Sequence, residues 1–222
     1  MGRARQQAMW PSRLRWTLLT SAGWFTGFFG GFVMAGAFEP MLGKGPLQSV
    51  AGYSLLGLCL GAGVGLMQWL ILRKRIAGTG SWVLAGAIGM CVAGGAGYGV
   101  AVLIFGYSEG LEDLGSGAAV MGWMLAAAFG GTVAGLLQRG ALSRHLRRPD
   151  WWVPASAVGW ALSIAAFGSM GVLGTRLVAE GDPVGAGWFF AGLIAGGLVL
   201  GVVTGAALAW LSSPPAGEAR QT

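Results

Sequence analysis

The chain has 222 residues, of which 55% are hydrophobic and only 10% charged, with 43 glycines and a formal net charge of +6. Soluble domains carry about a quarter of their residues as charged side chains, so a chain this poor in charge cannot cover its surface against water. The composition excludes an ordinary water-soluble domain and favours an integral membrane protein.

Apolar runs of membrane-spanning length follow one another between clusters of charge. A helix crosses the bilayer core with about 20 apolar residues, whereas a transmembrane strand needs about ten with alternating polarity. The predicted transmembrane helices are Trp16–Phe38, Ala51–Leu72, Trp82–Phe105, Gly117–Gln138, Trp152–Gly174 and Gly185–Leu211. The sequence therefore predicts an all-α integral membrane protein with a basic tail over 1–15, a transmembrane domain over 16–212 and a short tail over 213–222.

The first predicted helix has features of a signal peptide, since a basic start and an apolar stretch precede Ala35-Gly36-Ala37. We expect it to remain as a transmembrane helix, because its apolar part is longer than a usual signal-peptide core. Cys59 and Cys91 lie inside separate spans at different depths. Free, inert thiols are therefore expected rather than a disulfide.

Positive charge is distributed unevenly between the two sides of the predicted bundle. All but two of the 14 Lys and Arg residues lie in the tails or in the loops after the second and fourth helices; the exceptions are Lys44 and Arg176. The positive-inside rule then places both termini in the cytoplasm. The expected location is a bacterial cytoplasmic (inner) membrane or an intracytoplasmic, thylakoid-type membrane.

The basic loops are also predicted to bind anionic lipid headgroups, which attract Lys and Arg at the membrane surface. The residues concerned are Arg73, Lys74, Arg75, Arg144, Arg147 and Arg148. The net charge accordingly reflects membrane orientation, and no nucleic-acid partner is expected.

A short motif recurs at constant spacing along the chain. Gly65-Leu66-Met67-Gln68 is followed by Gly135-Leu136-Leu137-Gln138 and then by Gly205-Ala206-Ala207-Leu208. The intervening helices repeat as well, because they open on Trp16, Trp82 and Trp152. Self-similarity of this kind predicts three two-helix hairpins, approximately 16–75, 81–145 and 151–212, in a bundle with pseudo-threefold character.

Small residues recur every fourth position on several predicted helices. Helices in lipid associate through close van der Waals contact, which small residues permit. The glycines predicted to pack are Gly23, Gly27, Gly31, Gly57, Gly61, Gly65, Gly131, Gly135, Gly159, Gly197, Gly201 and Gly205. We expect these contacts within the chain; the alternative is contact with another subunit.

The pattern G-L-x-Q-W-x-x-L-R over Gly65–Arg73, followed by Ser81-Trp82-x-x-Ala85-x-x-x-Gly89, resembles one repeated in multi-pass membrane proteins of cyanobacteria and other bacteria. A second copy, Gly135–Gln138 with W-x-x-A-x-x-x-G-W over Trp152–Trp160, is similar, whereas the third departs by carrying Leu208. The resemblance implies a repeated helical fold and no established activity.

Uncharged polar and aromatic side chains are the candidate site residues, because the predicted spans contain no Asp, Glu, Lys, Arg or His. Ion-coupled carriers usually keep such groups at the midplane, so this absence disfavours them. Gln68 and Gln138 are predicted to hydrogen-bond between helices, the alternative being ligand binding. Trp24 and Trp160 are expected to pack in the bundle, the alternative being stacking on a carotenoid or chlorin.

Seven tryptophans near the predicted cytoplasmic boundary are expected to lie in the headgroup region: Trp10, Trp16, Trp69, Trp82, Trp151, Trp152 and Trp210. His145, the single histidine, lies among arginines and is expected to be solvated or near headgroups; the alternative is axial ligation of a (bacterio)chlorophyll. One histidine and two separated cysteines do not supply the ligands of a zinc site, so no metal is predicted.

No catalytic motif is present, so the protein is predicted not to be an enzyme. The preferred hypothesis is an accessory or scaffold subunit that packs laterally in a larger membrane complex, with a photosynthetic or respiratory assembly as a candidate setting. Its expected partners are membrane lipids, one of them bound, and other integral membrane subunits. The alternative is a small-solute transporter or the substrate-binding component of an uptake system.

Overall fold

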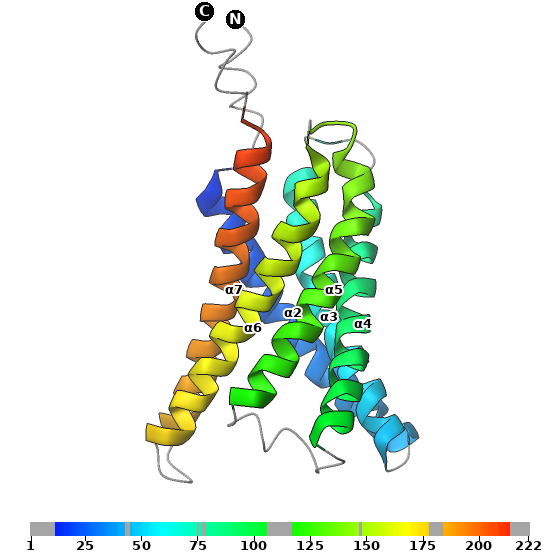
Figure 1. The fold of residues 1–222 in the computed structure, drawn as a ribbon, viewed down its shortest axis with the longest axis vertical. Coiled ribbons are helices and arrows are strands. Elements are labelled where there is room, and N and C mark those ends of the chain that lie inside the picture. The colour runs from blue at the N-terminus through cyan, green and yellow to red at the C-terminus, as the bar shows by residue number, and fades with distance from the viewer. Residues whose placement is uncertain are drawn as a thin grey trace, which may run out of the picture.

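Long helices make up nearly all of the described chain in the computed structural model (Figure 1). The structure describes residues 12–42, 45–74, 76, 79–105, 117–146, 148–177 and 184–213. The helices are α2 (Arg13–Leu42), α3 (Pro46–Leu72), α4 (Ser81–Phe105), α5 (Gly117–Leu142), α6 (Trp152–Leu177) and α7 (Val184–Leu211), with a 3-10 turn, η2 (Pro149–Trp151), before α6. No strand occurs in these ranges, and the predicted all-α class is confirmed.

All six helices are long and apolar enough to cross a membrane. The shortest, α4, has 25 residues, which corresponds to about 38 Å at the α-helical rise and exceeds a hydrocarbon core of about 30 Å. A bilayer offers no partners for backbone N–H and C=O groups, so a helix, which pairs them internally, suits such a segment. These observations support a multi-pass membrane protein, and each predicted span lies inside one observed helix.

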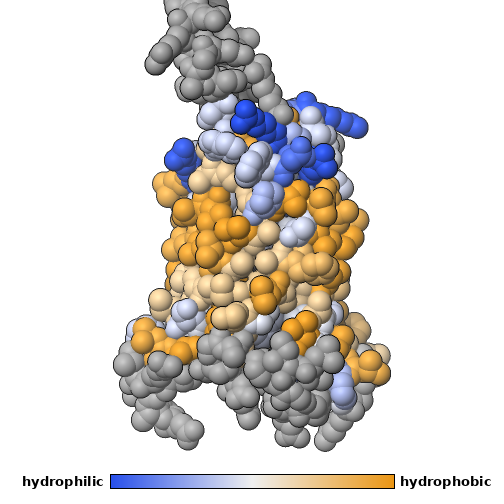
Figure 2. Space-filling view, viewed as in Figure 1, coloured by the Kyte–Doolittle hydropathy of each residue, from blue (hydrophilic) through white to orange (hydrophobic). Residues whose placement is uncertain are grey.

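The surface divides in the way that a membrane protein requires. Figure 2 shows apolar side chains in a belt around the middle and hydrophilic side chains gathered at the end where α7 finishes. At this end, called the basic end below, α2, α4 and α6 begin and α3, α5 and α7 finish. Exposed basic residues of the described loops lie here: Arg73, Lys74, Arg144 and Arg148.

The helices form a closed ring in chain order. Each helix packs against the next one, and α7 returns to pack against α2. No other pair of these six helices brings Cα atoms within 8 Å of each other. The axis of the ring is therefore occupied by side chains alone, and residues from all six helices meet there.

Glycines set the close spacing between neighbouring helices. A Cβ atom at Gly57 would collide with the carbonyl oxygen of Met90 in α4, and one at Gly197 would lie 2.9 Å from Cα of Ser21 in α2. The predicted packing glycines face neighbours as follows: Gly23, Gly27 and Gly31 face α3; Gly57, Gly61 and Gly65 face α4; Gly131 and Gly135 face α6; Gly159 faces α7; Gly197, Gly201 and Gly205 face α2. These stripes thus lie between helices of the ring.

Candidate functional site

Large apolar side chains fill the ring axis at the basic end. Trp16, Trp82 and Trp152 are almost fully buried there, and the rings of Trp82 and Trp152 lie 5.5 Å apart. The expectation of a headgroup position is wrong for these three tryptophans, because they are buried and their N–H groups find acceptors inside the ring. Trp151 and Trp210 are exposed, and Trp10 lies outside the described residues. The cluster consists of Trp16, Ile71, Leu72, Ile76, Trp82, Leu142, Leu146, Trp152, Leu208 and Leu211. This end cluster closes the axis at the basic end.

Two of these indoles donate to glutamines on the preceding helix of the ring. Nε1 of Trp82 lies 3.0 Å from Oε1 of Gln68 in α3, and Nε1 of Trp152 lies 2.9 Å from Oε1 of Gln138 in α5. Gln68 also donates through Nε2 to the hydroxyl of Thr20 in α2, over 3.4 Å. Both glutamine side chains are buried and joined to a neighbouring helix.

The third indole uses a different acceptor. Nε1 of Trp16 lies 3.0 Å from Oγ1 of Thr204 in α7. The Thr204 hydroxyl donates its own proton to the carbonyl oxygen of Leu200 over 2.6 Å, which leaves its lone pairs free to accept. Leu208 stands one helical turn further along α7, where the other two copies of the motif have glutamine. A threonine one turn away therefore replaces the missing amide.

A polar layer lies on the ring axis next to the end cluster. Gln68, Gln138, Thr204 and Ser156 border a common void of about 10 Å³. This volume is at the lower limit for one water molecule. The layer can therefore join helices through hydrogen bonds, but it has no room for a larger ligand.

Trp24 and Trp160 lie beyond the polar layer, and the structure brings them together. Their ring centroids are 5.5 Å apart at an interplanar angle of 33°. Trp160 borders the small polar void, whereas Trp24 borders a much larger space on the other side. The pair therefore separates the polar layer from the far half of the ring.

The far half of the ring contains a cavity of about 440 Å³, which we call the chamber. All six helices contribute to its wall, with Phe28, Tyr53, Met90, Trp123, Phe167 and Phe189 as one representative of each. The rings of Phe28, Phe167 and Phe189 lie 5.5–5.7 Å from one another, and Tyr53 lies 5.1 Å from Trp123. None of the described residues that line the chamber is charged. Its volume falls within the range of roughly 300–1,000 Å³ typical of small-molecule sites.

Comparison with known proteins finds no matching family model, no similar curated protein and no similar solved structure. The resemblance in the glycine–glutamine motif consequently stays a prediction.

The basic loops carry the remaining candidate residues. Arg73 stacks over Trp69, with Cζ 4.8 Å from the ring centroid, and His145 is exposed with Nδ1 3.4 Å from the carbonyl oxygen of Ala141. His145 follows α5 at the basic end, whereas the chamber lies in the other half of the ring, so it cannot bind a chamber ligand. The predictions for Arg75 and Arg147 lie outside the described residues.

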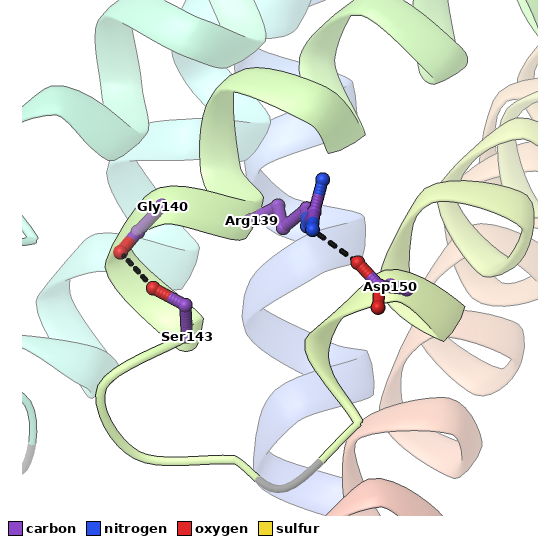
Figure 3. Close-up of polar contacts among 4 residues, drawn as sticks. All are labelled: Arg139, Gly140, Ser143 and Asp150. Atoms are coloured by element: carbon purple, nitrogen blue, oxygen red, sulfur yellow. Dashed lines mark hydrogen bonds and ion pairs between the residues drawn. The ribbon is translucent and has the colours of Figure 1, made fainter.

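An ion pair joins the two ends of the loop between α5 and α6. Nε of Arg139 lies 2.5 Å from Oδ1 of Asp150, and Ser143 donates to the carbonyl oxygen of Gly140 over 2.9 Å (Figure 3). Both charged side chains are largely exposed, so the pair contributes at most about 1 kcal/mol to stability. The pair lies at the basic end, away from the chamber.

Sequence reasoning missed the chamber and most of the residues around it. Phe28, Phe167 and Phe189 are ordinary apolar residues in a membrane span, and only their convergence on one axis distinguishes them. The sequence does show one sign of the chamber: in the half of α2 away from the basic end, four phenylalanines lie within about two turns, namely Phe25, Phe28, Phe29 and Phe32. A high density of aromatic residues is found at binding sites and in packed helix contacts alike, and the sequence alone does not distinguish the two.

Proposed function

We propose that this protein is a non-enzymatic membrane protein that binds a neutral hydrophobic molecule inside its helix ring. This is the binding-component class that the sequence left open as the alternative. The observation that carries the proposal is the chamber of about 440 Å³, to which all six helices contribute and whose lining, among the described residues, carries no charge. Cavities of this size and lining suit small apolar ligands.

The closed basic end supports binding rather than free passage. The end cluster and the hydrogen-bonded polar layer fill the axis on one side of the chamber. A solute would have to displace buried tryptophans and break their hydrogen bonds to cross. With the basic end in the cytoplasm, as the charge distribution favours, the chamber lies in the outer half of the membrane. A ligand would then be held in that half.

The ring itself is proposed to be a pseudo-threefold assembly of three hairpins. Support comes from three tryptophans at corresponding positions of the repeat, Trp16, Trp82 and Trp152. Each donates its indole N–H to the helix that precedes its own in the ring, which for Trp16 is α7. The first helix of the second and third repeats packs on the last helix of the repeat before it, α4 on α3 and α6 on α5. The last helix of the third repeat, α7, closes the ring on α2. Such an arrangement yields one axial chamber shared by all repeats, instead of one site in each repeat.

An accessory role in a larger complex stays a second proposal. The outer face of the ring carries many exposed large apolar side chains, among them Leu14, Val33, Leu84 and Leu125, which face lipid or a partner equally well. The packing glycines, however, lie between helices of this chain. A lateral partner would therefore meet the bulkier side chains, and copurification of other subunits is the observation that would favour it.

Binding of a hydrophobic probe to the purified protein in lipid nanodiscs tests the main proposal. The probe is fluorene, a flat neutral hydrocarbon, measured by equilibrium dialysis with empty nanodiscs subtracted. A Cβ atom at Gly171, which lines the chamber, meets no atom within 4 Å, so Gly171→Phe should occupy part of the chamber without a backbone clash. Gly122 has the same open surroundings and does not line the chamber, so Gly122→Phe is the matched control.

The expected result is saturable binding to the wild type and to Gly122→Phe, with binding by Gly171→Phe weakened at least tenfold. Mass spectrometry of the gently purified wild type should also reveal a copurified hydrophobic molecule that Gly171→Phe lacks. Equal binding by both variants, or no saturable binding by the wild type, would overturn the proposal.

A further inference from the structure

The ring closes where α7 meets α2, and of the six seams between neighbouring helices this one has the least extensive contact. The two helices lie close together near the basic end and run apart towards the other end (Figure 1). Near the basic end their backbones touch: a Cβ atom at Gly201 would lie 2.7 Å from Cα of Thr17. In the far half, on α2 beyond Trp24 and on α7 before Gly196, no described glycine of either helix has the other helix as its nearest neighbour.

The other five seams are closed by glycines in the far half. On each of them a glycine of one helix lies so near the next helix that a Cβ atom would meet one of its atoms at 2.9 Å or less. The contacts are those of Gly31 with Leu56, Gly94 with Tyr53, Gly97 with Ala126, Gly168 with Val120, and Gly192 with Phe167. Helices this close cannot admit a ligand between them without moving apart. The α2–α7 seam therefore differs from the other five.

Phenylalanine rings bridge α2 and α7 in the far half. Phe28 of α2 and Phe189 of α7 have ring centroids 5.7 Å apart, and both line the chamber. Phe29 and Phe190 form a second pair, with centroids 6.2 Å apart and an interplanar angle of 22°. Both members of this second pair are exposed and do not line the chamber. An inner and an outer pair of rings thus stand between the chamber and the surroundings.

The exposure of the chamber lining points to the same side of the ring. Of the described lining residues, only Phe32 of α2, Gly171 of α6 and Phe189 of α7 are exposed. The described lining residues of α3, α4 and α5 are buried or half-buried. The chamber is therefore most open beside the α2–α7 seam.

Aromatic side chains can open a seam in a way that glycine contacts cannot. Exposed side chains change rotamer within picoseconds to nanoseconds, whereas shifts of whole helices take microseconds or longer. Rotation of Phe29 and Phe190 would widen the gap between α2 and α7 without separating the helices. A neutral apolar molecule concentrates in the hydrocarbon of the bilayer, because leaving water gains about 25 cal/mol per Å² of apolar surface. A passage through the side of the ring reaches that supply directly.

We propose that a neutral hydrophobic ligand enters the chamber sideways from the bilayer, between α2 and α7, and that Phe29 and Phe190 form the gate. This inference rests on the proposed function, since it names the source of the ligand and its route to the same chamber. The ligand class is accordingly a lipophile dissolved in the membrane, and not a solute captured from water.

Exchange of a probe between lipid and protein tests the gate. A fluorene that carries one fluorine atom gives separate fluorine-19 resonances for the bound and the lipid-dissolved molecule in nanodiscs. Exchange spectroscopy measures the rate between the two states, and the resonance areas give the bound fraction. In the double variant Phe29→Ala with Phe190→Ala, exchange should accelerate about threefold or more while the bound fraction stays within about twofold of the wild type, because neither residue lines the chamber.

The matched control is Phe129→Ala. Phe129 of α5 is an exposed phenylalanine outside the chamber lining, and its replacement should change neither the exchange rate nor the bound fraction.

A reversible crosslink tests the same seam in the opposite direction. In a background with Cys59→Ser and Cys91→Ser, Phe29→Cys with Phe190→Cys places two exposed thiols across the gap. A short bis-thiosulfonate reagent joins them through disulfide bonds, and the linker then occupies the gap. The joined protein should exchange the probe at least tenfold more slowly than the same protein after reduction.

The outcomes separate the gate from the chamber. An exchange rate that the alanine variant does not raise, or that the crosslink does not slow, would overturn the gate and favour entry along the ring axis from the end opposite the basic end. Equal acceleration in Phe129→Ala, or a bound fraction that falls in the alanine variant, would also overturn it, because both indicate general loosening. Absence of a bound resonance in the wild type would instead overturn the proposed function.

Discussion

The indole N–H of Trp82 donates to the side-chain oxygen of Gln68 over 3.0 Å, from the start of α4 to the end of α3. Trp152 and Gln138 make the same contact between α6 and α5 over 2.9 Å. Both partners are buried in each case, so the bond ties two helices together at a fixed register. Interhelical bonds in lipid are worth roughly 0.6–2 kcal/mol.

Replacing Gln68 by leucine should destabilise the protein by about 1–3 kcal/mol, because it leaves the buried Trp82 N–H without an acceptor. Reversible unfolding in mixed micelles, followed by circular dichroism against the mole fraction of denaturing detergent, measures the loss. The double variant Gln68→Leu with Trp82→Phe should recover the part of the loss that comes from the unpaired indole, since both partners of that bond are then removed, whereas the Thr20 hydroxyl still lacks its donor. A double variant as unstable as the sum of both single variants would show that the residues do not act as a pair.

Gly57→Ala should destabilise the ring by about 1–3 kcal/mol, the usual cost of overpacking. Its new methyl group would collide with the carbonyl oxygen of Met90, so α3 and α4 would have to separate. Gly52→Ala on the same helix meets no atom within 4 Å and should be neutral or slightly stabilising, because alanine favours helix. Thermal unfolding in detergent distinguishes the two, and equal melting temperatures would contradict close packing at Gly57.

The helices were predictable from the sequence because apolar length is a local signal. The contacts of the tryptophans were not. Trp82 and Trp152 open their helices in the way that headgroup tryptophans do, and only the position of a glutamine on the neighbouring helix turns them inward. Trp24 and Trp160 occupy corresponding places in the repeat, yet only Trp24 keeps an unpaired buried N–H. That difference depends on which residues surround each ring.

The chamber was beyond sequence reasoning for a similar reason. An empty volume arises where six helices fail to fill their common axis, and it depends on distances between helices that no local pattern specifies. Phe28 and Phe29 are neighbours of the same type, but only Phe28 lines the chamber, while Phe29 is exposed. Helical periodicity can separate the two faces, but it does not reveal which face meets a cavity.

Both termini are expected to lie in the cytoplasm, and thiol labelling tests this. In a background with Cys59→Ser and Cys91→Ser, Ser143→Cys should mark the basic end and Leu47→Cys the opposite end, because both positions are exposed. A membrane-impermeant maleimide added to intact spheroplasts should label Leu47→Cys at once and Ser143→Cys only after permeabilisation. The reverse pattern would place the chamber in the cytoplasmic half of the membrane.

Thr204→Val should leave the buried Trp16 N–H without its acceptor, at a cost of about 1–3 kcal/mol. Valine keeps the branched shape of threonine, so the loss reports on the hydroxyl. If the three hairpins are true structural repeats, a glutamine at position 208 should reach Trp16 as Gln68 and Gln138 reach Trp82 and Trp152.

The double variant Thr204→Val with Leu208→Gln should therefore regain much of the stability that Thr204→Val loses. Leu208→Gln alone should destabilise the end cluster, because it buries an amide while Thr204 already accepts the hydrogen bond from the Trp16 indole. Unfolding of all three variants in mixed micelles gives the coupling between the two positions. Additive losses would mean that the third hairpin departs from the other two in geometry as well as in sequence, and the proposed threefold relation would then fail.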